Sequence, residues 1–202
     1  MVKKIVAVLF GGVSAEHEVS VISGIQVLEK IDRNKFDTFA INLTQNGILQ
    51  YYSNLFSRKN YLKIKPKIVN FGRDKNGSYF ITSGLFKEKI YIDVAYLAFH
   101  GGNGESGQIQ GLLETLNIPY TSSNVEASAI AMNKILTKEV LERQGISTVP
   151  WTRVFSRDIQ KDIDATVNMV LKHIKLPVII KPTHLGSSIS IKVAKSKVEL
   201  KK

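Results

Sequence analysis

The sequence predicts an α/β protein in which a doubly wound domain with a parallel sheet comes first and a smaller α+β unit follows. Two observations predict this class. Short apolar runs rich in valine and isoleucine alternate with stretches of helical periodicity, and glycine-rich turns follow strands, where ligands bind in such sheets. With 202 residues, 44% of them hydrophobic, the chain has room for two small domains, which we place at residues 1–122 and 123–202.

The composition argues against several classes of protein. No apolar run approaches the roughly 20 residues of a membrane helix. The first apolar run, residues 5–10, is shorter than a signal-peptide core and ends at Gly11 and Gly12. The chain has no cysteine, which excludes disulfides and thiolate metal sites. We therefore expect a cytoplasmic protein with no membrane partner.

The formal charge of +11 raises nucleic-acid binding as an alternative. Basic residues crowd one segment: Arg58, Lys59, Lys63, Lys65, Lys67, Arg73 and Lys75. Tyr61 and Phe71 lie among them, which would suit a surface on which bases stack. No zinc-finger, basic-zipper or RNA-recognition signature accompanies these residues, so a solvated lysine-rich surface is the favoured interpretation.

The first strand is predicted over residues 3–10 and the first helix over residues 15–31, with a turn at the two glycines between them. Buried positions recur at helical spacing in that helix at Val21, Ile25 and Leu28. Ser14 is placed to cap the helix, and Glu16 and Glu18 fall in its first turn, where the helix dipole favours carboxylates. Charge compensation is one interpretation of Glu16; the other is that it binds a ligand's ammonium group at the crevice.

The next part of the chain predicts a strand over residues 39–43 and two tight turns, Asn46-Gly47 and Asn76-Gly77. The second turn joins residues 68–71 to residues 79–81 in a hairpin. No chemistry is assigned to residues 45–90.

Residues 91–99 are predicted to form a strand that delivers His100 and a glycine-rich loop at its carboxyl end. A helix over residues 108–116 and a short strand over 119–121 follow. A lone histidine is usually structural, but this one stands where ligands bind in doubly wound sheets, so a functional role is favoured.

The second unit is predicted to begin with one continuous helix over residues 124–145, which ends at Gly145. Lys134 and Lys138 share a face of that helix, and sequence spacing alone does not separate a binding role from a surface role. A strand beginning at residues 150–154, a helix over 159–174, a strand over 189–193 and the first turn of a helix after Lys195 complete this unit.

Within this unit, residues 178–180 predict a strand covered on both faces, because Val178, Ile179 and Ile180 form a continuous apolar run. Lys181 ends the strand and would be costly to desolvate unless an anion meets it. Backbone donors and small side chains in residues 186–188 suit close approach to phosphate oxygens. A nucleotide-phosphate site is the functional interpretation, and a solvent-exposed lysine before an ordinary turn is the alternative.

Six stretches in order together resemble the D-alanine–D-alanine ligases of the ATP-grasp superfamily. They are residues 10–20 (FGGVSAEHEVS), 98–105 (AFHGGNGE), 107–111 (GQIQG), 119–121 (PYT), 131–134 (AMNK), and Lys181-Pro182 through Gly186-Ser187-Ser188. The resemblance covers residues 3–193 except for the region 45–90. It implies a doubly wound parallel-sheet N-terminal domain, the pre-ATP-grasp domain, followed by an incomplete α+β ATP-grasp subdomain.

The resemblance also implies a reaction and its residues. ATP would phosphorylate the carboxylate of one D-alanine, and the amine of a second would attack the acylphosphate to give the dipeptide of peptidoglycan precursors. Glu16 would hold the first ammonium group, with Ser187 as its partner in orienting substrates, and His100 would lie by the carboxylate. Lys134, Lys181, Ser187 and Ser188 would contact ATP. The resemblance further implies Mg²⁺ or Mn²⁺ and allows a homodimer.

The sequence departs from the family pattern at Ser106, where an acidic residue is usual, and at Ser190, where glycine is common. We expect that the C-terminal segment in which the family carries its metal ligands has no counterpart in these residues, so no metal ligand is assigned and we expect the chain alone to be inactive or nearly so. The alternatives are a D-alanine–D-lactate ligase, another ATP-grasp ligase, or a non-catalytic fragment that binds D-alanine or nucleotide.

Overall fold

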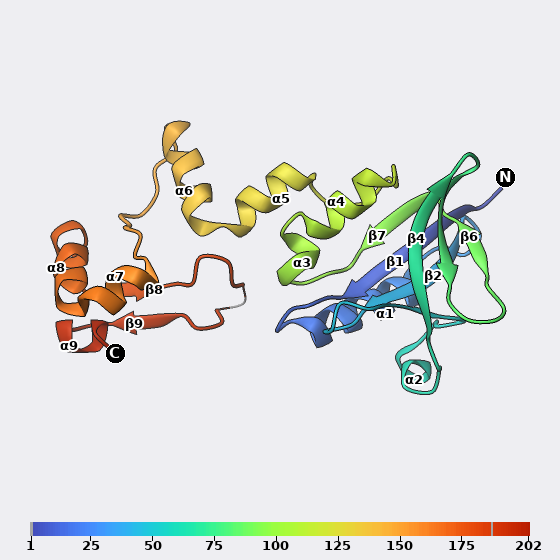
Figure 1. Cartoon of the computed structure of the whole chain (residues 1–202), viewed down its shortest axis with the longest axis horizontal. Helices are drawn as coiled ribbons and strands as arrows, with labels where there is room; N and C mark the ends of the chain where they lie inside the picture. The colour runs from blue at the N-terminus through green and yellow to red at the C-terminus, as the bar shows by residue number, and fades with distance from the viewer. Residues whose placement is uncertain (1, 187) are drawn as a thin grey trace. The chain divides into compact units, whose positions relative to one another are not determined.

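A computed structural model describes residues 2–186 and 188–202 of the chain. The chain divides into two compact units, residues 1–129 and 130–202. Figure 1 shows a sheet with its helices in the first unit and mainly short helices with a two-stranded sheet in the second. Each unit is described by itself below.

The first unit is built on a seven-stranded sheet with the order β6-β5-β4-β3-β2-β1-β7. Its strands are β1 (Lys4–Gly11), β2 (Phe36–Leu43), β3 (Leu49–Tyr52), β4 (Lys67–Asp74), β5 (Gly77–Thr82), β6 (Lys89–Tyr91) and β7 (Val94–Leu97). β1 pairs in parallel with both β2 and β7, whereas the strands from β3 to β6 extend the sheet in antiparallel pairs. The antiparallel extension includes both predicted Asn-Gly turns.

Helices cover both faces of the parallel strands, which confirms the doubly wound class. Helix α1 (His17–Lys30) packs Val21, Ile25 and Leu28 against one face. Helix α4 (Gln108–Thr115) packs Ile109 and Leu113 against the other. Successive β1 residues point to opposite faces, so both cores draw on the same strand and bury it completely from Val6 onward.

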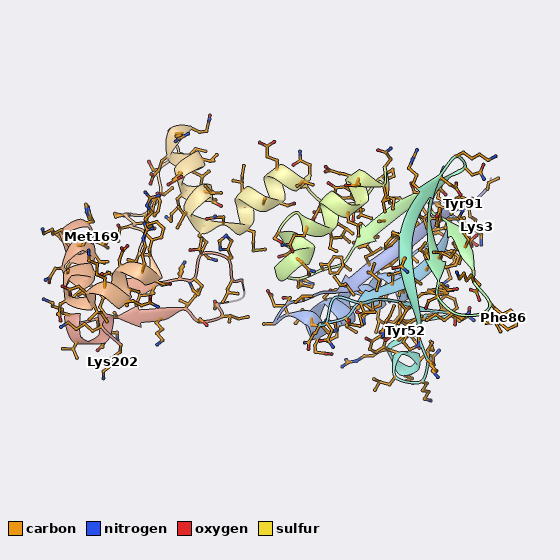
Figure 2. The ribbon with its side chains drawn as sticks, viewed as in Figure 1. Lys3, Tyr52, Phe86, Tyr91, Met169 and Lys202 are labelled. Carbon is orange, nitrogen blue, oxygen red and sulfur yellow. The ribbon has the colours of Figure 1, made fainter. Side chains whose placement is uncertain are left out.

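Two short helices complete this unit, α2 (Arg58–Tyr61) and α3 (Gly102–Glu105). The sequence did not predict α3, which forms inside the glycine-rich loop after His100. Phe86, in the connection between β5 and β6, projects away from the sheet (Figure 2) and is 84% exposed. In the described part of the chain, no helix is long and apolar enough to cross a membrane.

Three predictions in the first unit were wrong in detail. The strand over residues 91–99 is interrupted, because Tyr91 ends β6 while Asp93 turns back to accept a hydrogen bond from the Ile5 amide at 2.8 Å. Residues 119–121 contribute only one isolated bridge, between Tyr120 and Ala95. Ser14 does not cap α1: Glu16 is the N-cap, and the Ser14 hydroxyl accepts from the Glu16 amide at 3.0 Å in the turn before the helix.

The second unit contains helices α6 (Lys134–Arg143), α7 (Ser156–Lys161), α8 (Ile163–His173) and α9 (Lys197–Leu200), with β8 (Val178–Ile180) antiparallel to β9 (Lys192–Ala194). Helix α5 (Val125–Met132) runs across the division between the units. No regular strand forms over residues 150–154, contrary to prediction.

Both long predicted helices of this region are broken by a side-chain cap. Asn133 accepts from the amides of Ile135 and Leu136 and separates α5 from α6. Asp162 accepts from the amide of Ala165 and separates α7 from α8. Asn and Asp compete with the helical backbone in this way, so each starts a new helix where apolar periodicity alone predicted continuity.

The expectation that β8 is buried on both faces was also wrong. Val178 is buried, but Ile179 is 60% and Ile180 40% exposed. Among the described residues, β9 is the strand that pairs with β8, and Val178 and Ala194 are the buried positions of the two strands. The continuous apolar run therefore predicted the strand correctly and predicted its burial incorrectly.

Candidate functional site

In the first unit, the turn after β1 is tied to helix α1 and to the end of β7. The Ser20 hydroxyl accepts from the Gly11 amide at 2.7 Å and donates to the Ala98 carbonyl at 2.8 Å. The His17 ring, through Nδ1, contacts the Gly12 carbonyl at 2.9 Å, and because a carbonyl only accepts, Nδ1 carries the proton. The turn is thus fixed by buried hydrogen bonds.

Glu16 follows β1 and lies against the loop that follows β7. A β-carbon built on Gly101 would be 2.4 Å from Glu16 Oε2, so the carboxylate occupies the space that a side chain at residue 101 would need. Gly101 has φ +66°, a conformation that other residues adopt only with strain. Glycine at this position therefore permits the close approach of Glu16.

His100 reaches the same end of the sheet, because β7 is parallel to β1 and both strands end there. The ring is partly buried, and its Nε2 atom is 2.8 Å from the Ser23 hydroxyl of α1. The following loop is fastened by Glu105, which accepts from the Gly101 amide at 2.9 Å, and by Asn103, which accepts from Val13 at 3.1 Å. The first unit therefore brings the Glu16 and His100 segments together at one sheet edge.

The second unit contains a cavity of about 550 Å³ that is open to solvent and is lined by basic and apolar residues. Lys134, Lys138 and Lys181 reach it from α6 and from the end of β8. Its apolar lining includes Trp151, Ile163, Val167, Val170, Ile174 and Val178. Positive charge beside an apolar wall suits an anionic ligand with a flat apolar group.

Lys134 also links α6 to the loop after β8. Its backbone amide donates to the Thr183 carbonyl at 3.1 Å, and its ammonium group donates to the Leu185 carbonyl. Lys138 donates to the Val149 carbonyl at 3.4 Å, so the two ammonium groups bond to different segments of the second unit. The prediction that Lys134 and Lys138 share one face of a helix is confirmed, because both lie in α6 and both line the cavity.

Lys181 and the loop that follows it were predicted to contact phosphate. Lys181 is exposed, so its charge is solvated. The choice between a phosphate-binding lysine and a surface lysine stays a prediction. Ser188 has φ +60° and Ser190 has φ +58°, both in the left-handed region that favours glycine. Ser190 thus adopts the conformation for which glycine, common there in the family, is suited. Ser187 lies outside the described residues.

Sequence reasoning missed Trp151, which was assigned only to a strand. Its indole Nε1–H donates to Glu142 at 2.6 Å, and Lys138 Nζ lies 5.9 Å from its ring centroid. Hydrogen bonds from Thr148 and then Trp151 lower the pKa of the Glu142 carboxyl, so the acceptor stays charged. The sequence did offer one signal: a single tryptophan lies between a segment that carries lysines and a segment that carries arginines.

The basic segment at residues 58–75 does not present the proposed aromatic stacking surface. The Tyr61 ring stacks on Tyr52 with centroids 4.9 Å apart, and Phe71 packs against a core cluster of the sheet. Lys67 pairs with Glu88, and Arg73 donates to the Leu116 carbonyl at 3.3 Å. The aromatic residues serve the fold, which removes the argument for base stacking.

Among the described residues, no group of three or more His, Cys, Asp or Glu side chains could hold a metal ion. Glu16 and His100 belong to the first unit, and Lys134, Lys181 and Ser188 belong to the second. A common site formed by all of them stays a prediction.

Comparison with known proteins gives a consistent picture. The chain matches the profile of the "D-ala D-ala ligase N-terminus" over residues 5–123 and that of the "D-ala D-ala ligase C-terminus" over residues 140–202. It is 36% identical over 208 residues to the D-alanine–D-alanine ligase of Wigglesworthia glossinidia brevipalpis, covering 98% of this chain and 57% of the relative. The Thermosipho africanus enzyme is 37% identical over 201 residues, covering 96% of this chain and 53% of the relative.

Solved structures agree with these relatives. The D-alanine–D-alanine ligase of Coxiella burnetii superposes with a TM-score of 0.80 at 29% identity, covering 98% of this chain and 58% of that one. The VanG D-Ala:D-Ser ligase of Enterococcus faecalis gives 0.79 at 30% identity, with 98% and 57% covered. The chain spans little more than half the length of the curated relatives named above.

Proposed function

Because this chain belongs to the D-alanine–D-alanine ligase family, we propose that it forms the part of an ATP-dependent ligase that binds the first D-alanine and the nucleotide. The observation that carries the proposal is the convergence of Lys134, Lys138 and Lys181 on one cavity with an apolar wall. ATP combines a polyanion with an apolar base, which is the chemistry that this lining complements.

On the nucleotide side, Lys134 and Lys181 contact the phosphates in this proposal. Phosphoryl transfer requires mainly positioning and cationic charge around the phosphates, which two lysines supply. Lys134 already binds the Leu185 carbonyl, so the same side chain supports the loop that leads to Ser187 and Ser188. Ser188 and the glycine-bearing loop border the phosphate that is transferred in this proposal, and Ser187 contacts ATP and helps Glu16 to orient the substrates.

On the amino-acid side, Glu16 holds the ammonium group of the first D-alanine, and His100 lies by its carboxylate. Transfer of the γ-phosphoryl group to that carboxylate releases ADP and leaves an acylphosphate. The amine of a second D-alanine then attacks the acyl carbon, the carbon–oxygen bond to phosphate breaks, and the amine loses a proton. Alignment of the two amino acids converts this step into an effectively unimolecular one.

Mg²⁺ or Mn²⁺ enters the proposal through the family alone. The described residues offer no acidic cluster to hold the ion, so no step is assigned to it here. D-Lactate as second substrate is the alternative within the enzyme class, and the D-Ala:D-Ser ligase among the structural neighbours adds D-serine. The location in the cytoplasm and the homodimer stay predictions.

The nucleotide half of the proposal can be tested by fluorescence. Trp151 is the only tryptophan of the chain and lines the cavity, so its emission should change when ATP binds. Lys181→Ala should weaken ATP binding by about tenfold or more, because a phosphate loses a charged partner. Lys172→Ala, an exposed lysine outside the cavity lining, is the matched control. Absence of any fluorescence or calorimetric response to millimolar ATP would contradict this half.

The amino-acid half can be tested by Gly101→Ala. The new methyl group would displace the Glu16 carboxylate, which lies 2.4 Å from its position, and D-alanine binding measured by calorimetry should be lost. Gly47→Ala is the control, because Gly47 has a similar φ of +79° and nothing within 4 Å of the added carbon. Equal D-alanine affinity in the two variants would contradict the role of Glu16, and L-alanine at the same concentration controls for non-specific binding.

A further inference from the structure

We propose that Ser23 is a positioning residue for His100: its hydroxyl donates to Nε2 and holds the ring in the tautomer whose Nδ1–H faces the amino-acid carboxylate. The substrate part of this inference rests on the proposed function. The contact that carries it is the distance of 2.8 Å between the Ser23 hydroxyl oxygen and His100 Nε2.

Ser20 and Ser23 stand one turn apart on α1, and both reach the segment that leaves β7. Ser20 is completely buried and has both of its hydrogen bonds satisfied by backbone groups, so it serves the fold. Ser23 is only partly buried and bonds to a side chain instead. The two serines therefore have different roles: Ser20 fixes the backbone at the strand ends, and Ser23 fixes the His100 ring.

Either partner could donate across this contact, because a hydroxyl both donates and accepts and Nε2 of a neutral imidazole can do either. We assign the donor role to Ser23. A serine hydroxyl inside a helix often donates to the carbonyl one turn before it. Among the described residues, the Ser23 hydroxyl contacts His100 and bonds to no carbonyl of the preceding turn. Its proton is thus available to the ring, and a neutral imidazole that accepts at Nε2 carries its own proton at Nδ1.

That tautomer suits the proposed ligand. A carboxylate only accepts hydrogen bonds, so the ring nitrogen that faces it must carry a proton. With Nε2 occupied by Ser23, Nδ1–H is the remaining polar group of the ring. Without Ser23 the ring could rotate or exchange tautomers, and a nitrogen lone pair facing the carboxylate would repel it.

His17 supplies an internal reference for the measurement. Its Nδ1 bonds to the Gly12 carbonyl, so it too carries the Nδ1 proton, but through a contact that is independent of Ser23. The ¹⁵N chemical shifts of both rings, measured at about pH 8.5 where free imidazole is neutral, should show Nδ1 protonated in the unaltered chain. Loss of one signal set in His100→Gln assigns the His100 ring.

Ser23→Ala should move the His100 shifts toward a mixture of tautomers while the His17 shifts stay in place. D-Alanine affinity should fall by about tenfold, as expected for a mispositioned partner of a charged group. Ser23→Thr keeps a hydroxyl and should restore both readouts. Gln26→Ala, an exposed position on the same helix, is the control for the gain in helix propensity.

Unchanged His100 shifts in Ser23→Ala would overturn the positioning role. Altered shifts with unaltered D-alanine affinity would overturn the part that concerns substrate. If the unaltered chain does not bind D-alanine while the tautomer still depends on Ser23, the proposed function fails for the amino acid and so does the substrate part, but the Ser23–His100 assignment stands.

Discussion

The two units of the chain differ in how they hold their candidate site residues. In the first unit, buried apolar side chains fill both faces of the sheet, and the turn that leads to Glu16 is fixed by buried hydrogen bonds. In the second, the buried apolar residues among those described are Val167, Val170, Val178 and Ala194. The hydrogen bonds that the Lys134 and Lys138 ammonium groups donate to backbone carbonyls are exposed.

In the first unit, the proposed site residues are therefore held by a packed core. In the second unit, they are held by local hydrogen bonds. Regions with few buried apolar contacts open at lower free energy than a packed sheet. We therefore expect residues 130–202 to unfold before residues 1–129, and we expect ligand binding to stabilise the second unit more than the first.

The chain provides separate optical probes for this comparison. The tyrosines lie at positions 51, 52, 61, 79, 91, 96 and 120, all in the first unit, and Trp151 lies in the second. When Trp151 is excited selectively, its emission reports the unfolding of the second unit. The near-ultraviolet absorbance of the tyrosines reports the unfolding of the first unit. The predictions below use these two signals.

The largest effect is expected for Phe80→Ala. Phe80 is completely buried and contacts the rings of Phe39 and Tyr51, so its loss should cost about 3–5 kcal/mol. The tyrosine transition should move and the Trp151 transition should not. Phe86→Ala, which removes an exposed ring, is the control and should change stability by less than about 0.5 kcal/mol. Equal shifts of both signals would show that the two units unfold as one.

Val167→Ala should have an intermediate effect confined to the second unit. Val167 is buried in α8, and removal of two methyl groups should cost about 1.5–2.5 kcal/mol. The expected result is a lower midpoint of the Trp151 transition in urea. Val198→Ala, at an exposed position of α9, should leave that midpoint in place. A shift of the tyrosine signal alone would refute the assignment of this core.

A smaller effect of opposite sign is expected for Ser190→Gly. Ser190 has φ +58°, and glycine relieves the strain of that conformation by about 0.5–1 kcal/mol after its greater entropy in the unfolded chain is included. The Trp151 transition should move to higher urea concentration. Asn117→Gly, with φ +50° in the first unit, is the comparison and should gain less, because asparagine tolerates this region better than serine. Destabilisation by Ser190→Gly would contradict the strain.

The smallest effect concerns the pH dependence of stability that arises from the ion pair between Asp74 and Lys89. A hydrogen bond from Lys89 is the main cause that lowers the Asp74 pKa from 3.8 to about 2. A lowered pKa in the folded state stabilises the protein fully above about pH 4, and this contribution is lost as the pH falls toward 2. The stability difference between the unaltered chain and Asp74→Asn, read from the tyrosine transition, should shrink over that range. Lys89→Met should reduce the same pH dependence, because the Asn76 amide and the Tyr91 hydroxyl still donate to Asp74. An additive effect of the two changes would refute the pairing.

Much of the first unit could be predicted from sequence because local chemistry specifies it. The buried run of β1, the periodic apolar positions of α1 and the Asn-Gly turns each act over a few residues, and all of them form as expected. Six ordered motifs also pointed to the ligase family, which the profile matches confirm. These signals can be read from sequence because helical or strand periodicity and turn geometry depend on residues close together in the chain.

Sequence alone was sufficient for the α/β class, the glycine turns, the first strand and helix, and the family. Only the tertiary structure decided which face of β8 is covered, where Asn133 and Asp162 interrupt helices, and that Ser23 meets His100 across a separation of 77 residues. The physical reason is that burial and side-chain hydrogen bonds depend on partners brought together by folding, and a partner distant in sequence leaves no periodic signal in the chain.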